Sequence, residues 1–186
     1  MPAPTAAGTA GSASRSTGGG ARVLDALKTD LLSGFNEVSP VVSAARLVAA
    51  LVLGALIGLE REIKGKPAGL RTHVLVSAGA ALFVIVGLEL GDLTFGENGS
   101  HSIDPLRLIE AVTAGVAFLA AGLIFTSGGK VRNITTGAAL WLSGAIGLAC
   151  GAGEVPLAAM ATVLVLIVIS VLGWLETRTG LNDGQD

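Results

Sequence analysis

The chain has 186 residues, of which 51% are apolar and only 14% are charged, and its mean hydropathy is +0.72. Soluble domains carry about 25% charged residues. The lower fraction in this chain indicates an integral membrane protein, whose partner is the lipid bilayer that surrounds it. The 27 glycines show no period of three, which excludes collagen, and the apolar content excludes a disordered chain. The net charge of −2 argues against a nucleic-acid partner.

Residues 1–21 are rich in glycine, alanine and serine and predict a disordered tail. Between Arg22 and Val38, apolar residues recur at steps of three and four, which predicts a short amphipathic helix. This helix is too charged to span a bilayer, and it lies either at the membrane interface or packed as an ordinary soluble helix. Ser39 and Pro40 then predict a new helix start, as N-cap and first helical residue.

Five apolar segments follow, each of roughly 17 to 21 residues, the length that a helix needs to cross about 30 Å of hydrocarbon. They run approximately over Val41–Leu59, Val74–Leu90, Leu106–Thr126, Ile134–Ala152 and Pro156–Leu175. Asp104 and Pro105 repeat the capped start before the third segment. Backbone N–H and C=O groups cannot form hydrogen bonds with water inside the lipid, so a spanning segment must pair them internally. The five segments are therefore predicted to be helices. The predicted fold is an all-α polytopic membrane protein, with five transmembrane helices over residues 39–176 and a tail over residues 177–186.

Basic residues lie mostly on one side of the predicted spans. Four follow the first span, two follow the third, and one lies in the C-terminal tail. The loops on the other side, from Gly91 to Pro105 and near Glu154, contain no lysine or arginine. The positive-inside rule therefore places the C-terminus in the cytoplasm and the N-terminus outside.

Several spans carry pairs of glycines four residues apart, which allow helix backbones to approach closely. The pairs are Gly54 with Gly58, Gly87 with Gly91, and Gly147 with Gly151. They predict either tight packing within one bundle, which we favour, or a seam between copies in a homo-oligomer.

One acidic residue lies about one turn inside the third span. A charge at membrane depth is costly, so Glu110 is expected to have a partner or a role. Arg107 lies three residues earlier on the same helical face and is placed to neutralise it.

A second group of polar residues crowds the ends of the first two spans on the basic side. Its members are Glu60, Arg61, Glu62, Arg71 and His73. The group is either functional or a solvated structural cluster, in which Glu60 pairs with Lys64 and Glu62 with Lys66. Carboxylates suit Mg²⁺, but the spacing matches no dedicated cage, so we expect no cofactor and leave a metal site open. Thr135 and Thr136 open the fourth span and either cap it or bond a neighbouring helix.

Enzyme signatures are missing from the sequence. It contains no phosphate-binding G-x-x-x-x-G-K-[ST] loop, no H-E-x-x-H and no G-x-S-x-G. We therefore expect no enzymatic activity and no catalytic residues.

Three stretches in order, GALIGLEREIKGKPAGLRTH, DPLRLIEAVTAGVAFLAAGLIF and TTGAALWLSGAIGLACG, resemble the successive motifs of the MgtC/SapB family. The resemblance covers about Arg46 to Leu175. It implies a bacterial inner-membrane location, about five transmembrane helices and a link to magnesium homeostasis. In pathogens, family members are associated with virulence, and some are reported to act on the F-type ATP synthase.

The resemblance assigns candidate residues in each motif: Gly58, Glu60, Arg61, Glu62, Gly69, Leu70, Arg71, Thr72, His73, Asp104, Arg107, Gly115, Phe118, Gly122, Thr135, Thr136 and Trp141. Gly115 and Gly122 are expected to serve helix packing, although Ala117 and Ala120 replace two glycines that the family usually has nearby. Glu110 occupies a position at which family members commonly have glutamine. Longer members add a C-terminal domain resembling ACT modules, which is not expected here.

These observations favour a protein of magnesium homeostasis that acts as a regulatory or accessory partner of another membrane complex. The alternative is a Mg²⁺ or proton transporter or channel that works as an oligomer. In that case Arg107, Glu110 and the polar cluster would line the ion route.

Overall fold

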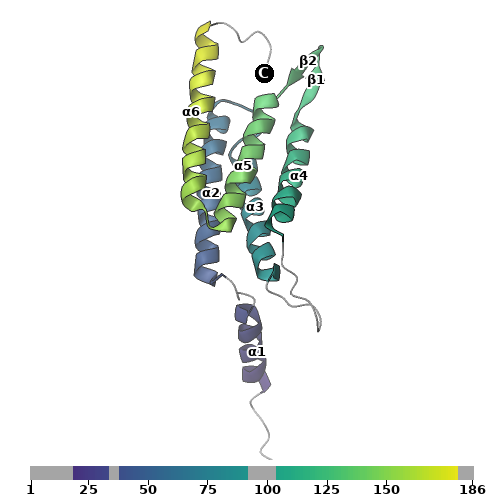
Figure 1. Cartoon of the computed structure of the whole chain (residues 1–186), viewed down its shortest axis with the longest axis vertical. Coiled ribbons are helices and arrows are strands. Elements are labelled where there is room, and N and C mark those ends of the chain that lie inside the picture. Colours follow the sequence, from purple (N-terminus) through teal and green to yellow (C-terminus); the bar gives the residue numbers. More distant parts are fainter. Residues whose placement is uncertain (1–18, 34–37, 92–103, 180–186) are drawn as a thin grey trace, which may run out of the picture. The chain divides into compact units, whose positions relative to one another are not determined.

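The computed structural model describes residues 19–33, 38–91 and 104–179 (Figure 1). The chain divides into a first unit up to Gly34 and a second unit from Phe35 onward. The first unit contains helix α1 (Gly19–Ser33). The helix begins before the predicted start at Arg22 because glycine carries no periodic signal, and residues 34–37 lie outside the described part. The predicted disordered tail also lies outside it up to residue 18. The placement of α1 at the membrane interface stays a prediction.

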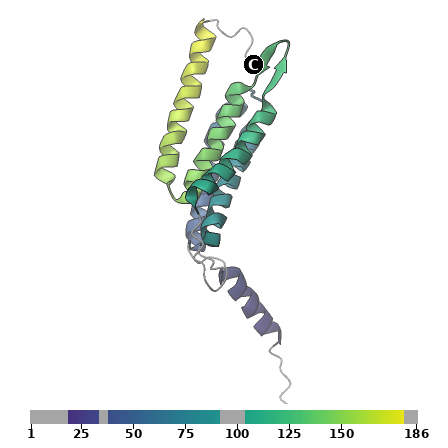
Figure 2. The ribbon, with the colours of Figure 1, turned by 45° about the vertical axis from the view of Figure 1, so that its right-hand side comes forward.

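The second unit contains five long helices: α2 (Pro40–Ile63), α3 (Leu70–Gly91), α4 (Pro105–Leu123), α5 (Ile134–Ala152) and α6 (Val155–Thr179). All five are long and apolar enough to cross a membrane, which confirms the all-α multi-pass fold. The helices run alternately up and down (Figures 1 and 2). Helix α6 continues to Thr179, into the predicted tail, and residues 180–186 lie outside the described part.

Two helix starts are capped as predicted. The Ser39 hydroxyl accepts a hydrogen bond from the Val42 N–H at 3.4 Å, and Asp104 Oδ1 accepts one from the Leu106 N–H at 3.0 Å. A proline follows each cap at the first helical position, where its missing N–H costs nothing. These two signals therefore fix where α2 and α4 begin.

Helix α5 is the centre of the bundle and packs against α2, α3, α4 and α6. In its most apolar stretch 56% of the residues are buried, compared with 17% in α4 and in α6. Figures 1 and 2 show α5 between α6 and α4. The helix reaches this position because its sequence is rich in glycine, alanine and serine, so its neighbours can approach from several sides.

The glycine pairs act inside the bundle. A Cβ added at Gly54 would lie 2.7 Å from Ser77 Cβ, and one at Gly151 would lie 2.5 Å from the Ala81 carbonyl oxygen. Gly147 lies against the backbone of Ser77 in the same way. Real Cβ atoms do not approach within 3.0 Å, so only glycine permits these contacts among α2, α3 and α5. The contacts favour packing within one bundle over a seam between copies.

The glycines predicted to serve helix packing differ between α2 and α4 in what they contact within the described residues. Gly58 also faces the backbone of α3, but an added Cβ at Gly115 or Gly122 would meet nothing within 4 Å among the described residues. The close contact between α4 and α5 is instead made by Val116, which packs on Gly144. The buried face of α4 repeats every four residues through Val116, and both glycines fall off that face.

A β-hairpin replaces the end of the third predicted span. Helix α4 ends at Leu123, and strands β1 (Phe125–Ser127) and β2 (Lys130–Arg132) pair in antiparallel register. Gly128 and Gly129 join them with φ values of 61° and 78°, the positive values that a two-residue type I′ turn needs. Ile124 and Phe125 extend the apolar run past the helix, so hydropathy alone gave a span that was too long.

The bundle has two ends: the hairpin end, which carries the β-hairpin and the α2–α3 turn, and the opposite end. At the opposite end, two charged side chains form hydrogen bonds with backbone groups. Arg46 Nη1 of α2 donates to the Gly151 carbonyl oxygen at 2.9 Å, and Glu89 Oε1 of α3 accepts from the Val38 N–H at 2.9 Å. Arg46 thus satisfies a carbonyl in the last turn of α5, where the helix dipole is negative.

Candidate functional site: a polar cluster at the hairpin end

A buried hydrogen bond joins α2 to α5 at the hairpin end. Arg61 is only 3% exposed, and its Nη2 donates to Thr136 Oγ1 at 3.1 Å. Thr136 is itself 2% exposed. The sequence places Arg61 at the end of an apolar helix, and the packing of α2 on α5 then encloses it. The result is a guanidinium held inside the protein, whose desolvation must be offset by polar contacts.

Glu60 supplies the negative charge in this cluster. Its Oε1 lies 2.6 Å from Lys64 Nζ, which confirms the pair predicted one turn apart, and its Oε2 lies 3.8 Å from Arg61 Nη1. Lys64 also donates to the Ile169 carbonyl oxygen at 3.2 Å. One carboxylate therefore lies between two cations, and Lys64 connects α2 to α6.

Two further cluster members organise the start of α3. Glu62 Oε2 accepts a hydrogen bond from the Leu70 N–H at 2.9 Å, and an added Cβ at Gly69 would collide with this carboxylate. His73 is fully buried, its Nδ1 lies 2.8 Å from the Gly69 carbonyl oxygen, and its Nε2 has no hydrogen-bond partner among the described residues. The pairing of Glu62 with Lys66 stays a prediction.

The two threonines at the start of α5 differ in role. Thr136 accepts the hydrogen bond from Arg61, which was one of its two predicted roles, whereas Thr135 is exposed. The N-cap position belongs to Asn133, which has a φ of 63° and forms no side-chain cap. Its side-chain amide donates to the Leu123 carbonyl oxygen at 3.0 Å.

Other residues assigned by the resemblance lie on the surface. Arg71 is exposed on the first turn of α3, and Thr72 beside it is half-buried. Phe118 is 80% exposed and Trp141 is 40% exposed. In a membrane, these aromatic side chains on α4 and α5 face lipid or another protein.

The acidic residue of the third span does not join the cluster. Asp104, Arg107 and Glu110 lie at the start of α4, at the opposite end of the bundle, and all three are exposed. The Glu60 ion pairs lie at the hairpin end, and the pairing of Arg107 with Glu110 stays a prediction. In the part of the chain that the structure covers, no three His, Cys, Asp or Glu side chains are grouped for a metal ion.

A polar cavity of 280 Å³ opens beside the cluster. Its polar lining consists of Arg61, Lys64, Lys66, Asn133, Thr135 and Thr136. Sequence reasoning had not singled out Asn133, and it had treated Lys64 and Lys66 only as ion-pair partners. The sequence feature that could have indicated this cavity is the concentration of basic residues in the α2–α3 turn. This turn lies opposite the start of α5 in the folded chain.

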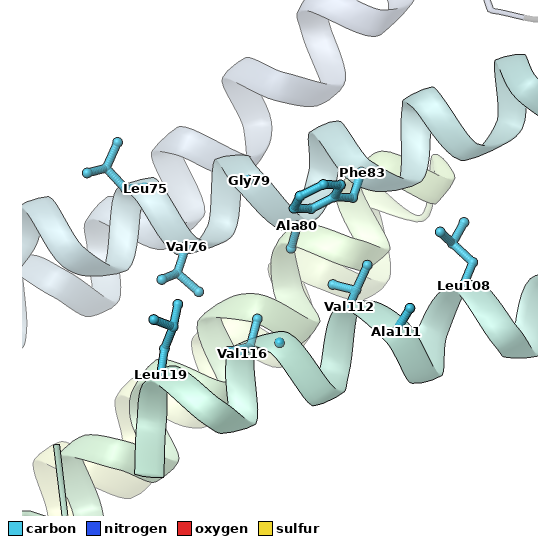
Figure 3. A pocket seen from close by; sticks show the side chains of 11 residues that line it. Leu75, Val76, Gly79, Ala80, Phe83, Leu108, Ala111, Val112, Val116 and Leu119 are labelled. Carbon is cyan, nitrogen blue, oxygen red and sulfur yellow. The ribbon is translucent and has the colours of Figure 1, made fainter. Parts of the chain in front are cut away.

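A larger cavity of 530 Å³ lies between α3 and α4 and is lined only by apolar residues. Figure 3 shows Phe83 and Val76 of α3 facing Val112 and Leu119 of α4 across it. Gly115 contributes to this space by having no side chain. No polar side chain lines this cavity, so it offers no side-chain ligand for an ion.

Comparison with known proteins agrees with this architecture. The sequence model of the MgtC family matches residues 47–178. Protein MgtC of Brucella abortus (strain 2308) is 42% identical over 130 residues, which are 70% of this chain and 51% of that protein. The putative magnesium transporter YhiD of Escherichia coli (strain K12) is 38% identical over 133 residues, 72% of this chain and 61% of that protein.

The chain thus spans about half the length of the Brucella relative that it matches. No solved structure matches it significantly. The family match begins after the first two turns of α2, includes α3, α4 and α5, and ends one residue before the end of α6. The chain therefore belongs to the MgtC family.

Proposed function

We propose that this multi-pass membrane protein acts in magnesium homeostasis in the bacterial inner membrane, as a non-enzymatic regulatory or accessory partner of another membrane complex. The names of its relatives, MgtC and a putative magnesium transporter, support the link to magnesium. The basic residues at the hairpin end support a cytoplasmic position for that end, with the N-terminus outside. The F-type ATP synthase is the partner that the family resemblance implies.

The main observation that supports this proposal is the closely packed interior of the bundle. Helices α2, α3 and α5 contact each other backbone to backbone. Away from the hairpin end, where Arg61, His73 and Thr136 are buried, the residues between these helices are small or apolar. Ala50, Ala81 and Cys150, for example, are fully buried. An ion that crosses a membrane needs polar groups or water along its path. A single copy packed in this way is better suited to contact a partner than to conduct ions.

Site-directed photo-crosslinking in the native membrane tests the proposal. A photoreactive residue at Phe118 on α4 should capture one defined membrane protein when magnesium is scarce, and the same protein should co-purify with the wild-type chain. Leu164 on α6, which is 56% exposed, is the matched control position. If neither position captures any protein other than this chain, and none co-purifies, the accessory role is contradicted.

The exposed pair on α4 favours a second candidate function. Arg107 and Glu110 are both exposed although they lie within an apolar helix. In a homo-oligomer, α4 helices from several copies would bring these groups together along a Mg²⁺ or proton route. This transporter function requires that Glu110→Gln abolish flux, whereas the accessory role predicts no flux to abolish.

A further inference from the structure

The polar cavity at the hairpin end is lined by three basic side chains and by no acidic one. Arg61 and Lys64 come from the last turns of α2 and its C-cap, and Lys66 comes from the turn that follows. Glu60 lies nearby and pairs with Lys64 at 2.6 Å, but it does not line the cavity. The lining itself therefore carries three positively charged side chains and no negatively charged one.

The opposite wall of the cavity is the start of α5. Asn133 occupies the N-cap position in a left-handed conformation and makes no side-chain cap, and its Nδ2 donates to the Leu123 carbonyl oxygen. The first-turn N–H groups of α5 therefore donate no hydrogen bond to the side chain of this residue. They add the positive end of the helix dipole to the charge of the basic side chains.

These groups are held in place before any ligand arrives. Arg61 is bonded to Thr136 at 3.1 Å, and Lys64 is anchored to the Ile169 carbonyl oxygen at 3.2 Å. The cavity measures 280 Å³, and a water molecule occupies about 30 Å³ of liquid, so a tetrahedral oxyanion fits with water around it. Lysine, arginine, hydroxyl and helix N–H donors together are the chemistry that recognises phosphate.

We propose that this cavity binds a phosphate group, carried either by free inorganic phosphate or by the headgroup of an anionic lipid. Lys66, the Thr135 hydroxyl and the first-turn N–H groups of α5 donate to the phosphate oxygens, and Arg61 and Lys64 supply the surrounding charge. The position at one end of the membrane-spanning helices makes both sources accessible. This site goes beyond the magnesium-linked role and does not depend on it.

Two substitutions test the site without removing its buried parts. Lys66→Glu reverses a charge in the lining. Thr135→Asp places a carboxylate in the first turn of α5, where it takes the position of the anion and is favoured by the helix dipole. The exposed Thr135 tolerates the change, so this variant should melt no lower than the wild-type chain. Arg71→Glu is the matched control, since Arg71 is an exposed base at the same end that does not line the cavity.

The measurement uses the full chain in phosphatidylcholine nanodiscs. Isothermal titration with inorganic phosphate tests the free anion, and native mass spectrometry after addition of phosphatidylglycerol tests the lipid. We expect the wild-type chain and Arg71→Glu to bind at least one probe, and Lys66→Glu and Thr135→Asp to bind it about tenfold more weakly or worse.

The two probes separate the two sources. Binding of free phosphate identifies a soluble ligand, and retention of phosphatidylglycerol alone identifies a lipid headgroup. The proposal is overturned if the wild-type chain binds neither probe, or if both cavity variants bind as tightly as the wild type.

Discussion

Arg61 of α2 and Thr136 of α5 are 75 positions apart in the sequence, and a hydrogen bond of 3.1 Å joins their side chains inside the protein. The same guanidinium lies 3.8 Å from Glu60. Because a buried guanidinium is stable only when polar partners replace its water, the contact fixes α2 and α5 in one relative position. The hairpin end of the bundle therefore contains a buried polar contact that joins two helices.

Removal of the Thr136 hydroxyl should weaken the fold. Thr136→Val keeps the shape of the side chain but leaves the Arg61 donor without this acceptor, which costs about 1–3 kcal/mol of unfolding free energy. Chemical unfolding in detergent measures the loss. Thr135→Val is the control, because Thr135 is exposed and its change should stay within about 0.5 kcal/mol. Equal stability of the two variants would show that the buried hydrogen bond contributes nothing.

The close contact between α5 and α3 at Gly151 should tolerate no added methyl group. Gly151→Ala places a Cβ 2.5 Å from the Ala81 carbonyl oxygen, so α3 and α5 must separate, at a cost of about 1–3 kcal/mol or more. Gly122→Ala is the matched control, since the added Cβ meets no described atom within 4 Å and alanine favours the helix by up to about 1 kcal/mol. Melting temperatures in the same detergent should fall for the first variant and hold or rise for the second. The opposite order would contradict the packing described for α5.

The C-terminal end of α5 should loosen when its arginine is lost. Arg46→Gln removes the bond to the Gly151 carbonyl oxygen and a positive charge at the negative end of the helix dipole, together about 1–2 kcal/mol. Hydrogen–deuterium exchange should become faster at Gly153, in the turn between α5 and α6. Arg71→Gln, at an exposed arginine on the other end of the bundle, should leave that exchange unchanged. Unchanged exchange in both variants would rule out a capping role for Arg46.

The helices were predictable because local physics determines them. Hydropathy located all five membrane helices, and the Ser39–Pro40 and Asp104–Pro105 pairs located two of their starts. The β-hairpin was missed because Ile124 and Phe125 are as apolar as the helix before them. Gly128 and Gly129 were the available signal, since adjacent glycines between two short runs are typical of a hairpin turn.

The candidate site was predictable only where its contacts are local. The Glu60–Lys64 pair follows from helical spacing and is present. The bond from Lys64 to Ile169 on α6 joins residues 105 positions apart, and no pattern within either segment indicates it. The cavity at the hairpin end has the same origin, since it forms where the end of α2 and the start of α5 meet after packing.

The most direct test of the closed bundle is Mg²⁺ flux into proteoliposomes that contain the purified full chain, read with an internal magnesium dye. A bundle whose core helices contact backbone to backbone predicts uptake equal to that of empty liposomes, for the wild-type chain and for Glu110→Gln alike. Uptake above the empty control that Glu110→Gln abolishes would contradict the account and establish the chain as a transporter.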